Sequence, residues 1–177
     1  FDDHFYVLTN GEHVGQRGIN GIIERAFGNA EQVKAQRRYL PGLAAGGVQW
    51  QTRSGDVDHP GVSEAELSFL EAVPDKIRQR LRRVFEEHPG VLSEQDLAFG
   101  IEASALDNIA SPTANLNTFH SLLQEDMATY IALQHEMHEL MEDLLAGAKQ
   151  QNLGESFFVH YAPNHGRGPD GKEIVWF

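Results

Sequence analysis

The densest group of side chains that could do chemistry lies in residues 133–144, LQHEMHELMEDL. If this stretch is helical, each residue turns by about 100°, and His135, His138 and Glu142 then fall on one flank, three and four residues apart. Two imidazoles and a carboxylate can hold a divalent metal when another ligand comes from elsewhere in the chain. The flank is therefore a candidate metal site, such as that of a metal-dependent hydrolase.

The further ligands of such a site would come from the polar segment that contains Asp56, Asp58 and His59. No known metal motif is matched, because HEMH places its second histidine one residue too early for HExxH. The repeated Glu-x-x-His of ferritin-like iron sites is also absent. A helix edge that merely meets solvent would carry the same residues, so a metal site and a solvated edge both remain open.

A second candidate site lies in residues 162–172, APNHGRGPDGK. Glycines allow backbone N–H groups to approach an anion, and His165, Arg167 and Lys172 supply charge and hydrogen-bond donors. The segment matches no phosphate-loop motif and precedes no predicted helix. An anion-binding loop and an ordinary hairpin loop are therefore the two interpretations.

Asp126 is unusual because its position predicts burial. It falls about 40° from the centre of the apolar stripe of the predicted long helix. A buried carboxylate is costly unless it is paired or hydrogen-bonded. We therefore expect Asp126 to form an ion pair with an arginine of the basic stretch 76–83, and a functional carboxylate with a raised pKa is the alternative.

The charge distribution excludes some classes of partner. The net charge is −12, and residues 84–148 contain no lysine or arginine. Such a tract repels nucleic acid, and it could attract a cation or a basic protein partner, although the interpretation we favour is that it keeps the protein soluble. The chain has no cysteine, which excludes disulfides and thiolate metal sites and fits either the cytoplasm or a secreted protein without disulfides. No apolar run approaches the roughly 20 residues that cross a bilayer.

The elements that would position these residues suggest a mainly helical α+β fold. Ser63 with Glu66 forms a capping-box pattern and Ser93 is an N-cap, which predicts shorter helices within residues 64–109. Asn20 and Asn29 are predicted to cap two short helices before them. An apolar stripe predicts one long central helix near 113–150, with Asp126 on its buried side.

Three segments are expected to be strands and one to be irregular. Residues 5–9, 157–161 and 173–177 are strand-like, and we expect a small antiparallel sheet built from the two chain ends. Residues 41–60 are rich in glycine and lack periodicity, which predicts a long irregular loop.

These patterns favour a single domain over residues 1–177, possibly a fragment of a larger protein, since the chain begins with Phe1. The function predicted first is a binding or assembly domain of a larger bacterial protein, with a protein as partner and no catalysis assigned. The alternative is the metal-dependent hydrolase that would use the His135–His138–Glu142 flank.

Overall fold

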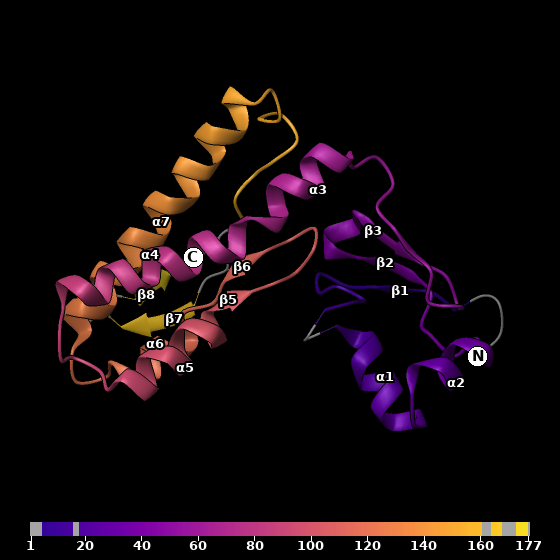
Figure 1. Cartoon of the computed structure of the whole chain (residues 1–177), viewed down its shortest axis with the longest axis horizontal. Coiled ribbons are helices and arrows are strands. Elements are labelled where there is room, and N and C mark those ends of the chain that lie inside the picture. The colour runs from indigo at the N-terminus through magenta and orange to yellow at the C-terminus, as the bar shows by residue number, and fades with distance from the viewer. Residues whose placement is uncertain (1–4, 16–17, 161–163, 168–172, 177) are drawn as a thin grey trace. The chain divides into compact units, whose positions relative to one another are not determined.

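The computed structural model describes residues 5–15, 18–160, 164–167 and 173–176 (Figure 1). The chain divides into two compact units, residues 1–137 and residues 138–177, which are described separately. Helices make up most of the regular secondary structure and the strands are short, which confirms a mainly helical α+β fold. In the described part of the chain, no helix is both long and apolar enough to cross a membrane.

The first unit begins with a four-stranded sheet in the order β1-β2-β3-β4. Its strands are β1 (Val7–Leu8), β2 (Gly42–Ala44), β3 (Gln49–Gln51) and β4 (Val57–Asp58), with the 3-10 turn Ala45–Gly47 between β2 and β3. β1 runs parallel to β2, and the other neighbours are antiparallel. The prediction of an irregular loop over 41–60 is therefore wrong. Strands of two or three residues are too short to show a periodic pattern. In addition, the residues that β3 buries are glutamines.

Two short helices accompany this sheet, α1 (Ile19–Phe27) and α2 (Ala30–Ala35). The backbone N–H of Gln32 donates to the side chain of Asn29 at 2.8 Å, which confirms Asn29 as an N-cap. Asn20 is not a cap, because α1 starts from Gly18 and Asn20 is buried within the first turn. Its side-chain amide instead forms hydrogen bonds with a strand of the sheet.

Three helices follow: α3 (Glu64–Glu71), α4 (Val73–Glu87) and α5 (Glu94–Ser104). The predicted capping box of Ser63 and Glu66 is present in both directions, and Pro74 lies in the first turn of α4. Ser93 caps α5 by accepting the N–H of Asp96 at 3.1 Å. α5 ends earlier than 109, because the chain turns into the hairpin of β5 (Ala105–Leu106) and β6 (Thr113–Ala114).

The predicted long helix is two helices, α6 (Asn117–Leu122) and α7 (Met127–Gln150). The break spans residues 123–126, where Asp126 starts a new helix, so the prediction of one helix over 113–150 is wrong. The apolar stripe predicted one continuous helix because the residues that both helices bury recur at spacings that also fit a single helix. The ring of Phe119 in α6 stacks on Phe85 of α4, with centroids 5.1 Å apart. The fully buried large apolar residues of the first unit are Ile77, Leu81, Phe119, Leu123, Tyr130 and Leu133.

The second unit contains the end of α7 and a separate hairpin, β7 (Asn164–Arg167) with β8 (Glu173–Trp176). β8 matches the predicted last strand, but residues 157–160 form no strand. The expected sheet from both chain ends is also wrong. β1 pairs with β2, and the C-terminal strands pair with each other.

Candidate functional site

A network of buried polar side chains lies on one face of the four-stranded sheet, which we call the inner face. His13 is fully buried at its centre. Its backbone N–H donates to the side-chain oxygen of Gln49 at 2.7 Å, and its Nε2 lies 3.2 Å from the carbonyl oxygen of Gly42. The amide nitrogen of Gln51 lies 3.3 Å from Nδ1. These contacts fit a neutral imidazole that donates from Nε2 and accepts at Nδ1, and burial lowers the pKa of His13.

Asn20 and Gln51 join α1 to β3 through a reciprocal pair of amide hydrogen bonds. Asn20 donates to Gln51 at 2.6 Å, and Gln51 donates back at 3.0 Å. Gln51 also donates to the carbonyl oxygen of Leu40 at 3.0 Å. Because buried amides are costly when unpaired, these bonds fix how α1 lies against the inner face.

The carboxylate of Glu12 extends this network to a distant turn. It is 4% exposed and accepts the backbone N–H groups of Ile109, Ala110 and Ser111 at 2.8, 2.7 and 3.0 Å. The hydroxyl of Ser111 adds a fourth donor at 3.3 Å. Successive N–H groups that converge on one carboxylate make a strong anion-binding arrangement. Glu12 therefore ties the segment after β1 to the β5–β6 hairpin.

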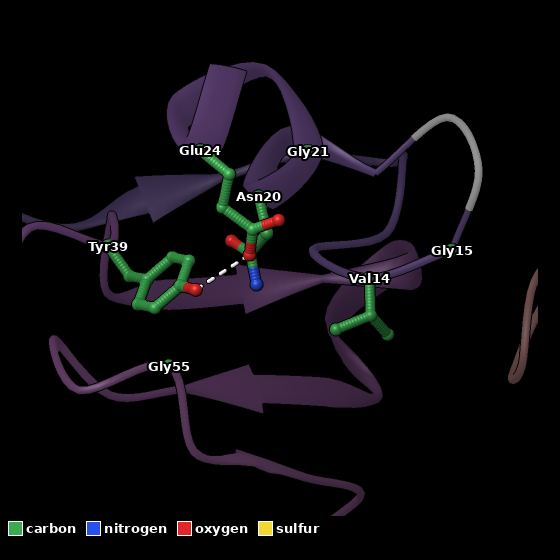
Figure 2. A pocket seen from close by; sticks show the side chains of 7 residues that line it. All are labelled: Val14, Gly15, Asn20, Gly21, Glu24, Tyr39 and Gly55. Atoms are coloured by element: carbon green, nitrogen blue, oxygen red, sulfur yellow. Dashed lines mark hydrogen bonds between the residues drawn. The ribbon is translucent and has the colours of Figure 1, made fainter. Parts of the chain in front are cut away.

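A cavity of about 250 Å³ opens beside this network (Figure 2). It is lined by Val14, Gly15, Asn20, Gly21, Glu24, Tyr39 and Gly55. Figure 2 shows Asn20 and Glu24 descending from α1 and Tyr39 pointing toward them from across the cavity. The hydroxyl of Tyr39 donates to Glu24 at 2.6 Å. Burial, together with the neighbouring Glu24, raises the pKa of Tyr39 to about 12, so Tyr39 remains a hydrogen-bond donor at neutral pH.

Gly55 forms the wall of the cavity behind Tyr39 and needs to be a glycine. Its φ is +79°, a conformation that side chains disfavour. A Cβ at this position would also lie 2.5 Å from the ring of Tyr39. The turn between β3 and β4 therefore leaves just enough room for the ring that points at Glu24.

The lining suits a neutral ligand with several hydroxyl groups. The Glu24 carboxylate has lone pairs that can accept from a ligand, and the oxygen of Tyr39, whose hydrogen goes to Glu24, can also accept a hydrogen bond. Of the described residues that line the cavity, none is basic. Hydroxyl groups of a ligand could donate to Glu24 and to the oxygen of Tyr39. We refer to this cavity as the Glu24–Tyr39 pocket.

The residues proposed from the sequence as a metal site do not form one among those that the structure describes. His135, His138 and Glu142 are exposed along α7. No three His, Cys, Asp or Glu side chains of the described residues come together to hold a metal. Asp58 is exposed, and His59 lies at the margin of the polar network, with its Nε2 3.2 Å from the amide nitrogen of Gln49.

The predicted ion pair of Asp126 is wrong. Asp126 caps α7 instead, and accepts the hydroxyl of Thr129 at 2.7 Å and its backbone N–H at 3.1 Å. These hydrogen bonds lower the pKa of Asp126. Of the stretch 76–83, Arg80 forms an ion pair with Glu136 on α7, with 2.9 Å between the charged atoms. The carboxylate was assigned to the buried stripe because the helix was assumed to continue through it.

Of the predicted anion-binding residues, Lys172 lies outside the described residues. The backbone of His165 and Arg167 belongs to β7, so this part of the segment is strand and not the predicted loop. Their side chains also lie outside the described part, and anion binding there stays a prediction.

Comparison with known proteins identifies the family. The chain matches the family described as glucosylglycerol-phosphate phosphatase over residues 1–177. It is 59% identical over 175 residues, 99% of its length, to the glucosylglycerol-phosphate phosphatase of Synechocystis sp.. This chain belongs to the glucosylglycerol-phosphate phosphatase family. It spans 42% of the length of that relative. No solved structure matches the chain.

Family membership overturns the function predicted first. A binding or assembly domain without catalysis, defined by protein–protein interaction, does not agree with a match to a phosphatase family over the whole chain. The hydrolase alternative is closer in class, although the metal flank on which it rested is not formed among the described residues. Sequence reasoning missed Glu24 and Tyr39 entirely. They lie fifteen residues apart in no recognised motif, and only the fold brings them together.

Proposed function

We propose that this chain is part of a longer phosphatase that hydrolyses glucosylglycerol phosphate or a closely similar sugar–glycerol phosphate. The observation that carries the proposal is the 59% identity over 99% of the chain with a protein of that name. In this reaction the oxygen of water bonds to phosphorus, the ester P–O bond breaks, and the polyol leaves as an alcohol after taking up a proton.

The Glu24–Tyr39 pocket supports the idea that different residues of such an enzyme bind the polyol and the phosphate of its substrate. The oxygens of its carboxylate and phenol can accept hydrogen bonds from the hydroxyl groups of the sugar and glycerol, and its described lining residues include no basic one. We infer that the pocket holds the neutral, hydroxyl-bearing part of the substrate. The phosphate would then be bound, and the ester cleaved, by residues other than those that line this pocket.

Phosphate release from two substrates tests both parts of the proposal. The full-length enzyme is assayed with glucosylglycerol phosphate and with p-nitrophenyl phosphate, which lacks the polyol. We expect Glu24→Gln to raise KM for the sugar substrate and to leave kcat/KM for p-nitrophenyl phosphate unchanged. Glu31→Gln, an exposed glutamate on the neighbouring α2, is the matched control and should change neither.

The outcomes separate the two parts. If the unmodified enzyme releases no phosphate from the sugar substrate, the proposed reaction is wrong. If Glu24→Gln slows both substrates equally, or neither, the reaction can stand but the pocket does not bind the polyol. Tyr39→Phe is an independent test of the pocket, because it removes the Tyr39 hydroxyl group and keeps the ring that Gly55 accommodates.

A further inference from the structure

The face of the four-stranded sheet opposite the polar network is apolar over β1, β2 and β3 and ends in Asp58 on β4, and we call it the outer face. Leu8 pairs with Leu43, Leu43 with Trp50, and Trp50 with Asp58, so one row crosses all four strands. Paired residues of adjacent strands share a face. The ring of Tyr6 stacks on Trp50 at 5.8 Å between centroids. Tyr6 is 58% exposed and Leu8 is 79% exposed.

This arrangement reverses the usual pattern of a sheet with one solvated face, in which apolar residues point inward and polar residues outward. Here the buried residues of β3 are Gln49 and Gln51, while Trp50 points the other way. A shift of one residue in register would bury Trp50 and expose the glutamines. The hydrogen bonds of Gln51 with Asn20 and of Gln49 with His13 prevent that shift. The polar network therefore holds the apolar residues outward.

The edge of the sheet next to this face is also open. The N–H groups of Val7 and Thr9 donate to Pro41 and Leu43, which leaves the alternate backbone groups of β1 pointing away from β2. Within the described residues, no strand pairs with that edge. Residues 6–9 carry no charge or proline that would protect an edge strand from unwanted pairing. An unprotected edge beside an apolar face is typical of a surface that is covered in the complete protein.

The length of the family relative indicates what covers it. The chain spans 42% of the Synechocystis protein, so more than half of that protein lies outside the matched stretch. A segment joined to the same polypeptide is present at high effective concentration, which a separate partner is not. We propose that the outer face, defined by Tyr6, Leu8, Leu43 and Trp50, packs against a part of the same polypeptide that lies outside these 177 residues. The contact would make this sheet one layer of a larger core.

Photocrosslinking in the full-length protein identifies the occupant. Position 8 is replaced by p-benzoylphenylalanine, and position 99 on α5 serves as the control, because Phe99 is also exposed, at 62%. The protein is mixed with an isotope-labelled copy, irradiated and digested. We expect position 8 to crosslink within one polypeptide to a peptide outside residues 1–177, and position 99 to give no such product.

Three results would overturn the proposal: a crosslink between labelled and unlabelled copies, a crosslink to residues 138–177, or no crosslink at position 8. Hydroxyl-radical footprinting of the unsubstituted full-length protein guards against a perturbed variant. In the full-length protein we expect Tyr6, Leu8 and Trp50 to be as protected from oxidation as buried Tyr130, while Phe99 stays reactive. Oxidation of the outer face as fast as Phe99 would mean that it faces solvent and that the proposal is wrong.

Discussion

The helical region, residues 64–137, and the sheet region, residues 5–58, are stabilised by different interactions. The interior of the helical region is mostly apolar, with fully buried Ile77, Leu81 and Phe119 beside two small polar residues, Ser104 and Thr129. The interior of the sheet region contains Glu12, His13, Asn20, Gln49 and Gln51, all buried and hydrogen-bonded. Apolar burial is non-directional and tolerates small rearrangements, whereas hydrogen bonds require defined partners and angles.

This difference explains where the candidate site lies. A directional network fixes the positions of α1 and β3, and the Glu24–Tyr39 pocket is bounded by that same helix and by the turn that follows β3. In the sheet region, the loss of a hydrogen-bonding partner leaves a buried polar group unpaired.

The largest effect is expected in the apolar region. Phe119→Ala should lower the free energy of unfolding by about 3–5 kcal/mol, because it removes a fully buried ring that contacts Phe85 and the backbone at Gly100. Urea denaturation measures this change, provided that the free energy of unfolding falls with urea concentration at the same slope in both proteins. Phe99→Ala, on the exposed side of α5, is the control and should cost far less. Equal losses for the two variants would show that α6 is not packed as described.

The same contrast determines what the sequence could reveal. In the helical region, capping residues and the apolar stripe predicted α3, α4 and the start of α5, because each signal is local and periodic. The break before α7 escaped prediction because Asp126 and Thr129 cap a helix whose stripe runs on from α6. In the sheet region, β2, β3 and β4 escaped because the strands are very short and because the buried residues of β3 are glutamines. The pairing of β1 with β2 depends on contacts more than thirty residues apart.

The second effect, smaller than the first, concerns the anchor of the polar network. Glu12→Gln removes the negative charge and replaces one carboxylate oxygen by an NH₂ group, so that a single oxygen remains to accept the N–H groups of residues 109–111. We expect a loss of about 1.5–3 kcal/mol, the range for hydrogen bonds to a charged group. Glu31→Gln, which is exposed, should be nearly neutral.

Hydrogen exchange gives the Glu12 prediction a second measurement that a general loss of stability would not reproduce. The amides of Ile109, Ala110 and Ser111 should exchange faster in Glu12→Gln, while those in the middle of α4 remain protected. If the three amides exchange at unchanged rates, Glu12 does not hold the turn.

The third effect is the dependence of stability on pH through His13. Burial lowers the pKa of His13 in the folded protein below its ordinary value of 6.5. The unfolded chain then binds a proton more readily, so His13 contributes stability that is present above pH 6.5 and is lost as pH falls through its folded pKa. Urea midpoints measured from pH 7.5 downward should therefore decrease, and this decrease should be smaller in His13→Gln. His135→Gln, at an exposed position, should keep the profile of the unsubstituted protein.

The candidate site was less accessible to sequence reasoning than the fold. Clusters of ionisable residues drew attention to α7, where the helix carries its histidines on the exposed surface. Glu24 and Tyr39, by contrast, are single residues in unremarkable contexts, and their 2.6 Å hydrogen bond depends on the turn at Gly55 and the position of α1. A local cluster of ionisable side chains in the sequence is therefore a poor predictor of a functional site that is assembled by tertiary contacts.

The smallest effect is expected at the metal flank proposed from the sequence. His135 is exposed on α7, and the described residues contain no group of three ligand-type side chains that could hold a metal. His135→Ala should therefore change the free energy of unfolding by no more than about 0.5 kcal/mol, as at an ordinary surface position. A metal that binds only the folded state would instead raise its stability, so thermal melts with and without chelator are the second measurement. If chelator lowers the melting temperature of the unsubstituted protein and not of His135→Ala, then His135 does ligate a metal, and the polar surface of the helical region has a role beyond solvation.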